Sequence, residues 1–257
     1  MQGTRTIRLL SLALLVTAAF FVFSGIGRGQ SVFRVPERLR LNGIGEPDPN
    51  EEGHMGVITG AFYPIGWSKD GKFAYLFEPP DEDCGCYFAE VVIQDLKTDK
   101  ILWKERYSSA QAENPLAENR ETLWKKNVKT YSAKFREHGI EQIDTFQLLH
   151  PSVKFESDVL TPKIDIRIKT DGNFMVDGTV TVRMTSRKHG SKVIHRDVYR
   201  RRDTNGFRDA EISGSLVSPF EPRAAIVIVE VVRGWEGPPN VMQIKIAGST
   251  LAGGFRK

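Results

Sequence analysis

The stretch "EPPDEDCGCYFAEVVIQD" contains the only two cysteines of the chain, Cys84 and Cys86, with Gly85 between them. Two thiols at this spacing can hold a metal ion, act as a redox switch or close a disulfide within one loop. A disulfide needs Cα atoms within about 7 Å, and glycine is the middle residue that bends at the least steric cost. A metal site needs further ligands, which the sequence does not supply. We therefore predict an intraloop disulfide, with free thiols and a redox-active bridge as the alternatives.

Other groups that could do chemistry lack a catalytic or metal-binding spacing. The acids Asp81–Asp83 read as a solvated turn, and "DPNEEG" begins like a calcium loop but has Thr59 where the bidentate glutamate belongs. The five histidines show no metal-ligand pattern. Nucleophile-elbow, zinc-protease and phosphate-loop motifs are absent. We predict no catalytic residues, no cofactor and no metal.

The basic stretch "RMTSRKHGSKVIHRDVYRRR" carries eight cations against Asp197 alone, a local charge of +7. Such a hairpin can dock an anionic envelope surface, such as phosphorylated lipid headgroups or a cell-wall polymer. It can also be a solvated hairpin whose charges keep sheet edges apart. Nucleic acid is not predicted, because no reading motif or aromatic stacking ladder accompanies the charge. The candidate anion-binding residues are Arg196, Arg200, Arg201 and Arg202.

The N-terminus has the pattern of a secretory signal. Two arginines precede the uncharged apolar run Leu9–Phe23, whose 15 residues fall short of the roughly 20 that span a membrane. Small residues follow in "SGIGRGQ", which favours cleavage after Gly27 or Gly29. We predict a signal peptide over residues 1–29, no transmembrane helix after its removal, and a secreted or periplasmic protein. An uncleaved anchor is the alternative.

Removal of this leader changes the composition. The leader carries three arginines and no acid, so the formal net charge falls from +4 to +1. No global attraction to nucleic acid follows from so small a charge. The remaining chain, 40% hydrophobic over the whole sequence, is long enough for one large domain or two small ones with a real core.

The mature chain divides into a flexible polar arm over residues 30–56 and a single β-rich domain with an inserted helix over residues 57–257. In "GWSKDGKFAYLFE" a tight turn at Asp70–Gly71 joins two strands, and in "FAEVVIQDLKTDKILWKE" a second turn at Thr98–Asp99 joins two more. The order predicts a four-stranded antiparallel meander.

One amphipathic helix is predicted over about 115–138. Asn114 is a candidate N-cap, Pro115 suits the first helical position and Gly139 ends the helix. We expect its apolar stripe to pack on the sheet. The stripe consists of Leu116, Trp124, Val128, Tyr131 and Phe135.

Strand patterns dominate the second half of the chain. Isoleucines alternate from Ile164 to Ile168, and apolar residues alternate from Val180 to Met184 after an expected turn at Asp177–Gly178. The segment "LVSPFEPRAAIVIVEVVRGWEGPPNVMQIKIAG" repeats the scheme of the first meander. The predicted class is α+β, mostly antiparallel β, with two blade-like β-meanders and one principal helix on the sheet.

The strand order around "WSKDGKFAYL" and "VVIQDLKTDKILW" resembles one blade of WD-repeat or Tol-type propellers. A propeller needs at least four blades, and a single partial echo argues against closure. Together with the leader, "YFAEVVIQD", a long helix ending in "HGI" and "SPFEPRAAIVIV…GWEGPP", the arrangement resembles a bacterial family of predicted secreted proteins of unknown function. The resemblance implies export and supplies no catalytic residues.

The sequence thus predicts a non-enzymatic binding or scaffolding module of the cell envelope or extracellular space. Its expected partner is an anionic envelope surface or another envelope protein. The alternative is an exported hydrolase whose acid-lined site is assembled by the fold. A deep pocket with two carboxylates or an acid–histidine pair would favour the hydrolase, and filled sheets with shallow grooves would favour the module.

Overall fold

A computed structural model gives the structure of the protein. It describes residues 32–43, 56–82, 84–171, 174–200, 206–235 and 237–257. The predicted signal peptide, the "DPNEEG" run, Asp83, Arg201 and Arg202 lie outside the described residues.

The first meander forms a five-stranded antiparallel sheet, here called the helix-side sheet. Its turns at Asp70–Gly71 and Thr98–Asp99 lie where the sequence predicts them, and a short strand, β6, adds to the edge beside β2. The order is β5-β4-β3-β2-β6. The strands are β2 (Ala61–Ser68), β3 (Lys72–Glu78), β4 (Phe88–Asp95), β5 (Lys100–Ser108) and β6 (Ile140–Gln142).

The C-terminal meander forms the second sheet, here called the middle sheet, in the order β1-β13-β12-β11. The short β1 pairs in parallel with β13, and the other pairings are antiparallel. The strands are β1 (Val57–Ile58), β11 (Phe207–Val217), β12 (Arg223–Gly234) and β13 (Gly237–Thr250).

The third sheet, here called the outer sheet, is antiparallel in the order β10-β9-β8-β7. The predicted turn at Asp177–Gly178 is wrong, because both residues pair with β8 inside β9, opposite Lys169 and Ile168. The Asp-Gly dipeptide is a local turn signal that the longer pairing with β8 overrides. The strands are β7 (Val153–Phe155), β8 (Asp158–Asp171), β9 (Phe174–Ser186) and β10 (Gly190–Arg200).

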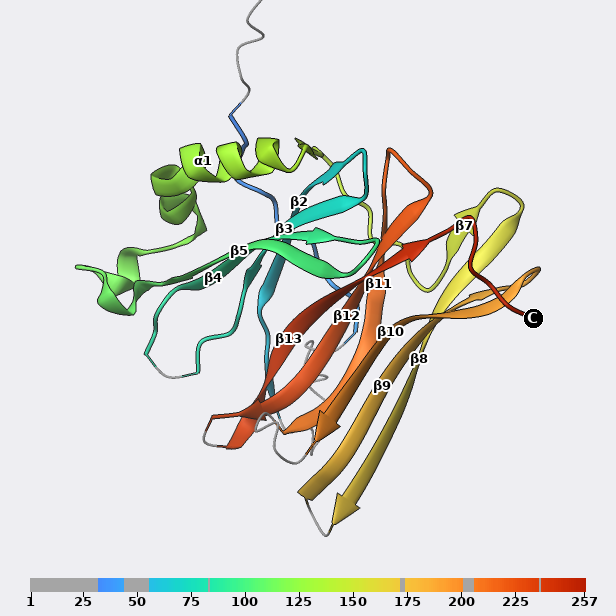
Figure 1. Ribbon diagram of the computed structural model, residues 1–257. Coiled ribbons are helices and arrows are strands. Elements are labelled where there is room, and N and C mark those ends of the chain that lie inside the picture. Colours follow the sequence, from blue (N-terminus) through green and yellow to red (C-terminus); the bar gives the residue numbers. More distant parts are fainter. Residues whose placement is uncertain (1–31, 44–55, 83, 172–173, 201–205, 236) are drawn as a thin grey trace, which may run out of the picture. The chain divides into compact units, whose positions relative to one another are not determined.

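The sheets stack in layers, with α1 (Arg120–Glu137) on the far face of the helix-side sheet (Figure 1). Three clusters of buried apolar residues hold the layers together. They lie between α1 and the helix-side sheet, between the helix-side and middle sheets, and between the middle and outer sheets. The middle sheet is therefore covered on both faces. This explains why "AAIVIVEVV" of β12 is apolar at consecutive positions rather than at alternate ones.

The helix begins five residues later than predicted. Asn119 caps it by accepting a hydrogen bond from the Thr122 backbone, and the Thr122 side chain accepts one from the Asn119 backbone in return. Residues Pro115–Ala117 form a separate 3₁₀ turn, so Leu116 is 80% exposed and does not belong to the buried stripe. The buried stripe consists of Leu123, Trp124, Tyr131, Ser132 and Phe135.

The predicted flexible arm differs from the structure over residues 32–43. Phe33 is buried beneath α1, and its carbonyl accepts a hydrogen bond of 3.0 Å from Trp124 Nε1. Leu39 forms a bridge to β2, and Asn42 bonds to β11. Apolar residues spaced along this segment anchor it to two layers, and residues from Val32 onward cluster as one compact unit.

The α+β class, dominated by antiparallel strands with one principal helix, is confirmed. The two meanders pack face to face through a shared core, and the described strands do not close into a propeller. Within the described part of the chain, no helix combines the length and apolar character that crossing a membrane requires.

Candidate functional site

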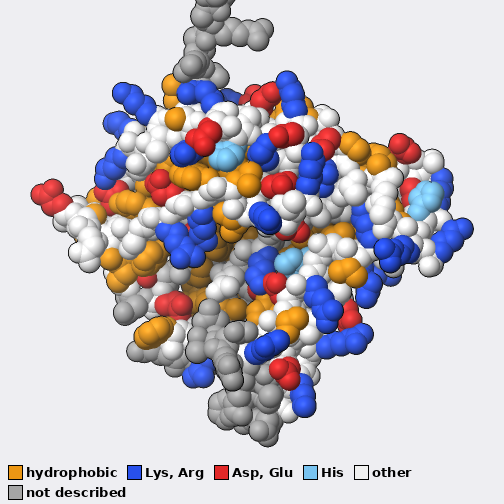
Figure 2. Space-filling view, viewed as in Figure 1, with side chains coloured by type: hydrophobic (Ala, Val, Ile, Leu, Met, Phe, Trp, Pro, Cys, Tyr) orange, Lys and Arg blue, Asp and Glu red, His pale blue; other side chains and the backbone are white. Residues whose placement is uncertain are grey.

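The exposed face of the outer sheet carries a cluster of cations, here called the basic face. Side chains of β8, β9 and β10 alternate between the core and this face, because successive residues of a strand point to opposite sides. Figure 2 shows Lys and Arg side chains over the region where Figure 1 draws these strands. The basic face consists of Lys163, Arg167, Lys169, Arg183, Arg196 and Arg200, with Asp165 and Asp177 as its acids.

Like charges stand directly opposite each other at one end of this face. Lys163 of β8 pairs in register with Arg183 of β9, and Arg196 lies on the neighbouring strand β10. These three side chains are exposed, and none makes an ion pair or a hydrogen bond with another described residue. Like charges directly opposite one another destabilise a sheet. The arrangement therefore has a cost to the fold that an anionic ligand would remove.

Of the predicted anion-binding residues, the structure places Arg196 and Arg200 on the basic face. Arg201 and Arg202 lie outside the described residues. Lys192, from the same basic stretch, points inward, where its Nζ donates to the carbonyls of Thr250 and Gly253 and lies 4.4 Å from the centre of the Phe255 ring. Burial, with a smaller contribution from the nearby Arg223, lowers the pKa of Lys192 to about 8.

Asp197, the only acid of the basic stretch, also points inward. Its carboxylate accepts from Lys245 Nζ of β13 and lies 3.1 Å from Nε2 of His195. The acid thus pairs with Lys245 between the layers and does not lie on the outward side of β10, where Arg200 stands in register with Asp177 of β9. His195 and Lys245 hold the pKa of Asp197 well below its usual range.

A buried polar cluster joins β10 to the middle sheet around this acid. Glu230 of β12 is 1% exposed, and its two oxygens contact Tyr199 Oη at 2.5 Å and Lys245 Nζ at 3.1 Å. Lys245 also donates to Tyr199 Oη at 2.8 Å. Burial, reinforced by the bond to Glu230, raises the pKa of Tyr199 above its usual range. With His195 and Asp197 this cluster has an acid–histidine pair and two carboxylates.

Sequence reasoning missed this cluster, because its members come from β10, β12 and β13. One signal was available: Glu230 is the single acid in the apolar run of β12, and a buried carboxylate requires a partner. Among the described residues no group of histidines, cysteines and acids has the arrangement of a metal site.

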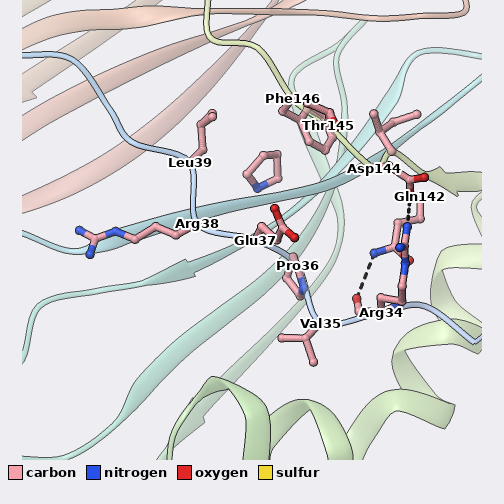
Figure 3. A pocket seen from close by; sticks show the side chains of 12 residues that line it. Arg34, Val35, Pro36, Glu37, Arg38, Leu39, Gln142, Asp144, Thr145 and Phe146 are labelled. Carbon is pink, nitrogen blue, oxygen red and sulfur yellow. Dashed lines mark hydrogen bonds and ion pairs between the residues drawn. The ribbon is translucent and has the colours of Figure 1, made fainter.

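Two cavities lie beside the segment that joins β6 to β7, and the cluster lines neither of them. The smaller, of about 160 Å³, lies between the arm and this segment (Figure 3). Arg34 there pairs with Asp144, and its backbone exchanges two hydrogen bonds with the Gln142 side chain. Glu37 also lines this cavity, whereas the Arg38 side chain extends away from it. The cavity therefore has two carboxylates, Glu37 and Asp144, and Asp144 is already paired with Arg34.

The cysteines lie in the loop between β3 and β4, and the structure joins Cys84 to Cys86 in a disulfide. Gly85 takes the left-handed conformation with φ of 64°, which few other residues adopt without strain. Next to the loop, Glu78 accepts hydrogen bonds from Tyr63 Oη at 2.6 Å and Tyr87 Oη at 2.9 Å. These bonds tie the loop to the sheet, which favours a structural role.

No protein-family model, curated protein or solved structure matches this chain. The resemblance to secreted bacterial proteins of unknown function therefore remains a prediction, and function has to be argued from the geometry of the chain itself.

Proposed function

We propose that the protein is an exported, non-enzymatic binding module that docks on anionic lipid headgroups through the basic face. The observation that carries the proposal is the opposed pair Lys163 and Arg183, exposed beside Arg196 without a partner among the described residues. A fold that needed these positions only for solubility would gain from alternating signs, because opposite charges across strands are stabilising.

The shape of the face favours a surface over a small ligand. The cations are spread over three adjacent strands, about 4.8 Å apart, and positions of one strand that share this face lie about 7 Å apart. Val198, 52% exposed, lies between Arg196 and Arg200. A flat array of this kind contacts many headgroups at once, and each cation near an anionic membrane contributes about 1 kcal/mol.

The test is a co-sedimentation assay with vesicles of phosphatidylglycerol and phosphatidylcholine. The variant replaces Lys163, Arg183 and Arg196 by Gln. The expected loss is roughly a hundredfold in affinity, from three cations at about 1 kcal/mol each. Binding of the unmodified protein should weaken with added salt, because the attraction is screened within about 8–10 Å at physiological ionic strength.

The matched control replaces Lys100, Lys125 and Lys129 by Gln, which removes the same charge from exposed positions on β5 and α1. This control should keep its affinity for the vesicles. Equal losses in both variants would show that only net charge matters and would overturn the proposal. Binding of dextran sulfate without any binding of vesicles would assign the face to a soluble polyanion instead.

An exported hydrolase is the second candidate, because His195 and Asp197 form an acid–histidine pair beside Glu230. Lys245 engages both carboxylates, however, and the cluster provides no hydroxyl other than that of Tyr199. Ester, phosphoester and peptide hydrolysis should be compared between the unmodified protein and a His195→Gln variant. Turnover that this substitution abolishes would favour the hydrolase over the binding module.

A further inference from the structure

Trp235 is the most exposed large hydrophobic residue that the structure describes. It follows the last residue of β12, in the turn before β13, and is 90% exposed. Its backbone N–H donates to Glu82 Oε2 at 2.6 Å, which fixes the turn against the loop between β3 and β4. The indole has no ring contact or hydrogen bond with a described residue. The backbone of the turn is therefore held in place while the indole stands in solvent.

The other three tryptophans of the chain pack inside it. Trp67 and Trp124 are buried, and Trp103 is partly buried against the cluster beneath α1. A tryptophan side chain has a surface of about 150–250 Å², most of it apolar, and its N–H suits it to a boundary between water and an apolar phase. A single exposed apolar residue needs no explanation by itself. The surroundings of Trp235 in the fold therefore decide whether it has a role.

Trp235 lies at the end of the layers where the basic face also ends. β10 finishes at Arg200, and the ring of the preceding Tyr199 stacks on Phe207 of β11 with 4.6 Å between ring centres. Phe207 pairs in register with Val232 of β12, three residues before Trp235. Figure 1 shows the turn between β12 and β13 toward the lower end of the picture, where β8 ends and β9 begins. The indole and the last cations of the basic face thus share one end of the molecule.

Further cations lie on the strands beside this turn. Arg233 comes two residues before Trp235, and its backbone N–H donates to the carbonyl of Gly206 next to β11, whose second residue is Arg208. Both arginines are exposed, and neither guanidinium group has an ion pair or hydrogen bond with a described residue. An exposed indole with cations nearby is the composition of segments that lie in a membrane interface, where the ring sits at the level of the headgroups and the cations meet the phosphates.

The shape of the turn favours a bilayer over other partners. A small ligand needs a concave site, and Trp235 lines neither of the two cavities beside the segment that joins β6 to β7. The indole instead projects from the tip of a hairpin, so it can be buried only by a partner that yields around it. The headgroup region of a bilayer does so, and the unpaired arginines match the charge of anionic lipids.

We propose that the Trp235 indole inserts into the headgroup region of the anionic membrane on which the basic face docks. The molecule then docks tilted, with the end that carries Lys169, Arg200 and Trp235 closest to the bilayer. This inference rests on the proposed function, to which it adds an orientation and an apolar anchor.

The experiment uses tryptophan fluorescence with the phosphatidylglycerol and phosphatidylcholine vesicles of the co-sedimentation assay. Trp235 is the one exposed emitter among four tryptophans, and a Trp235→Phe variant identifies its contribution. On binding, the Trp235 emission should shift to shorter wavelength and should be quenched by lipids brominated in the acyl chain. Trp235→Ala should weaken vesicle binding roughly tenfold, the effect of leaving about 60 Å² of apolar surface in water. Because the side chain is exposed, the variant should keep the unfolding midpoint of the unmodified protein.

The matched control moves the reporter to the other end of the helix-side sheet. Ile101→Trp in the Trp235→Phe chain places an indole at a 54% exposed position beside the turn between β4 and β5. This indole should show neither the shift nor the quenching, although the protein still co-sediments.

The outcomes separate this inference from the proposed function. Co-sedimentation without a change in the Trp235 emission would overturn the insertion and leave docking through the basic face intact. Equal changes at both reporter positions would show adsorption without a preferred orientation and would also overturn it. If the unmodified protein does not co-sediment at all, the proposed function fails and the insertion fails with it.

Discussion

The helix-side sheet and the outer sheet pack on opposite sides of the middle sheet, and they differ in whether the face that points away from the middle sheet is covered. The helix-side sheet is covered by α1, and β3 is buried at five consecutive positions. The outer sheet packs one face on the middle sheet and presents the other as the basic face, so β10 alternates between half-buried and exposed residues along its second half. Burial of its second face stabilises the helix-side sheet, whereas the uncovered face of the outer sheet is a surface that can bind a ligand.

The contrast also explains where unfavourable charges are placed. On the covered side, Tyr131 uses its hydroxyl to reach Glu105 while its ring stays buried. On the open side, Lys163 and Arg183 face each other at exposed positions, where solvent weakens the repulsion between them. The following predictions test this division between a stabilising side and a binding side.

The largest effect is expected beneath α1. Phe135→Ala removes a fully buried ring and should lower the free energy of unfolding by about 3–5 kcal/mol, measured in urea. Leu116→Ala is the matched control, because Leu116 is 80% exposed outside the helix, and it should change stability by less than about 0.5 kcal/mol. A large effect at Leu116 would restore the longer helix that the sequence predicts.

The next effect concerns the attachment of the outer sheet. Lys245→Met leaves the buried Glu230 without its cation and should cost about 3 kcal/mol. Adding Glu230→Gln in the same chain should recover part of this loss, because the uncompensated charge is gone. The control Lys126→Met breaks a surface ion pair with Glu118 and should change stability far less, because surface pairs contribute little. A small effect at Lys245 would mean that water reaches the cluster.

Asp197 gives this attachment a pH dependence. Its folded pKa is depressed by His195 and Lys245, so its contribution to stability is complete above the unfolded pKa of about 4 and is lost as the pH falls below that value. The stability difference between the unmodified protein and Asp197→Asn should therefore shrink between about pH 5 and pH 2. Urea unfolding across this range measures it, and a difference that stays constant would contradict the assignment.

The disulfide loop belongs to the covered side and should contribute less. Closing a ring of three residues removes little entropy from the unfolded chain, about 1.6 kcal/mol at most. The double variant Cys84→Ser, Cys86→Ser should lose no more than this amount. Mass spectrometry of protein from an oxidising compartment should show two hydrogens fewer on the peptide with both cysteines, whereas two freely alkylated thiols would refute the bridge.

The smallest effect on stability is expected on the basic face, where a substitution should raise the free energy of unfolding instead of lowering it. Arg183→Gln removes the repulsion with Lys163 and should stabilise the fold by a few tenths of a kcal/mol while weakening vesicle binding. Thermal unfolding and co-sedimentation of the same variant measure both quantities. A clear loss of stability would mean that Arg183 supports the sheet rather than binding.

Local chemistry accounts for the features that sequence reasoning predicted. Asp70–Gly71 and Thr98–Asp99 turn the first meander because tight turns depend on their own residues, and Asp99 indeed takes a positive φ of 58°. By local rules Asn114 and Pro115 are as good a helix start as Asn119. In the structure they begin a 3₁₀ turn instead, and Asn119 caps α1.

The candidate sites were less predictable, because they depend on pairing between distant strands. Arg196 and Arg200 were found from charge alone, but the opposition of Lys163 and Arg183 requires the register of β8 on β9. The contact of Glu230 with Lys245 likewise requires β12 beside β13, with β10 above them. A sequence pattern of period two reveals which face a residue joins, but not which residue stands opposite.

The parallel pairing of β1 with β13 has a consequence for the order in which the chain folds. Val57 pairs with Asn240, and Asn42 of the arm bonds to Ser213, so the N-terminal segment depends on partners near the other end of the sequence. The hairpins of the first meander need only neighbours in sequence and can form early, whereas contacts across long loops carry a larger closure entropy and form late. In a chain that emerges N-terminus first, Asn42 and Val57 therefore cannot reach these partners until β11 and β13 have been synthesised.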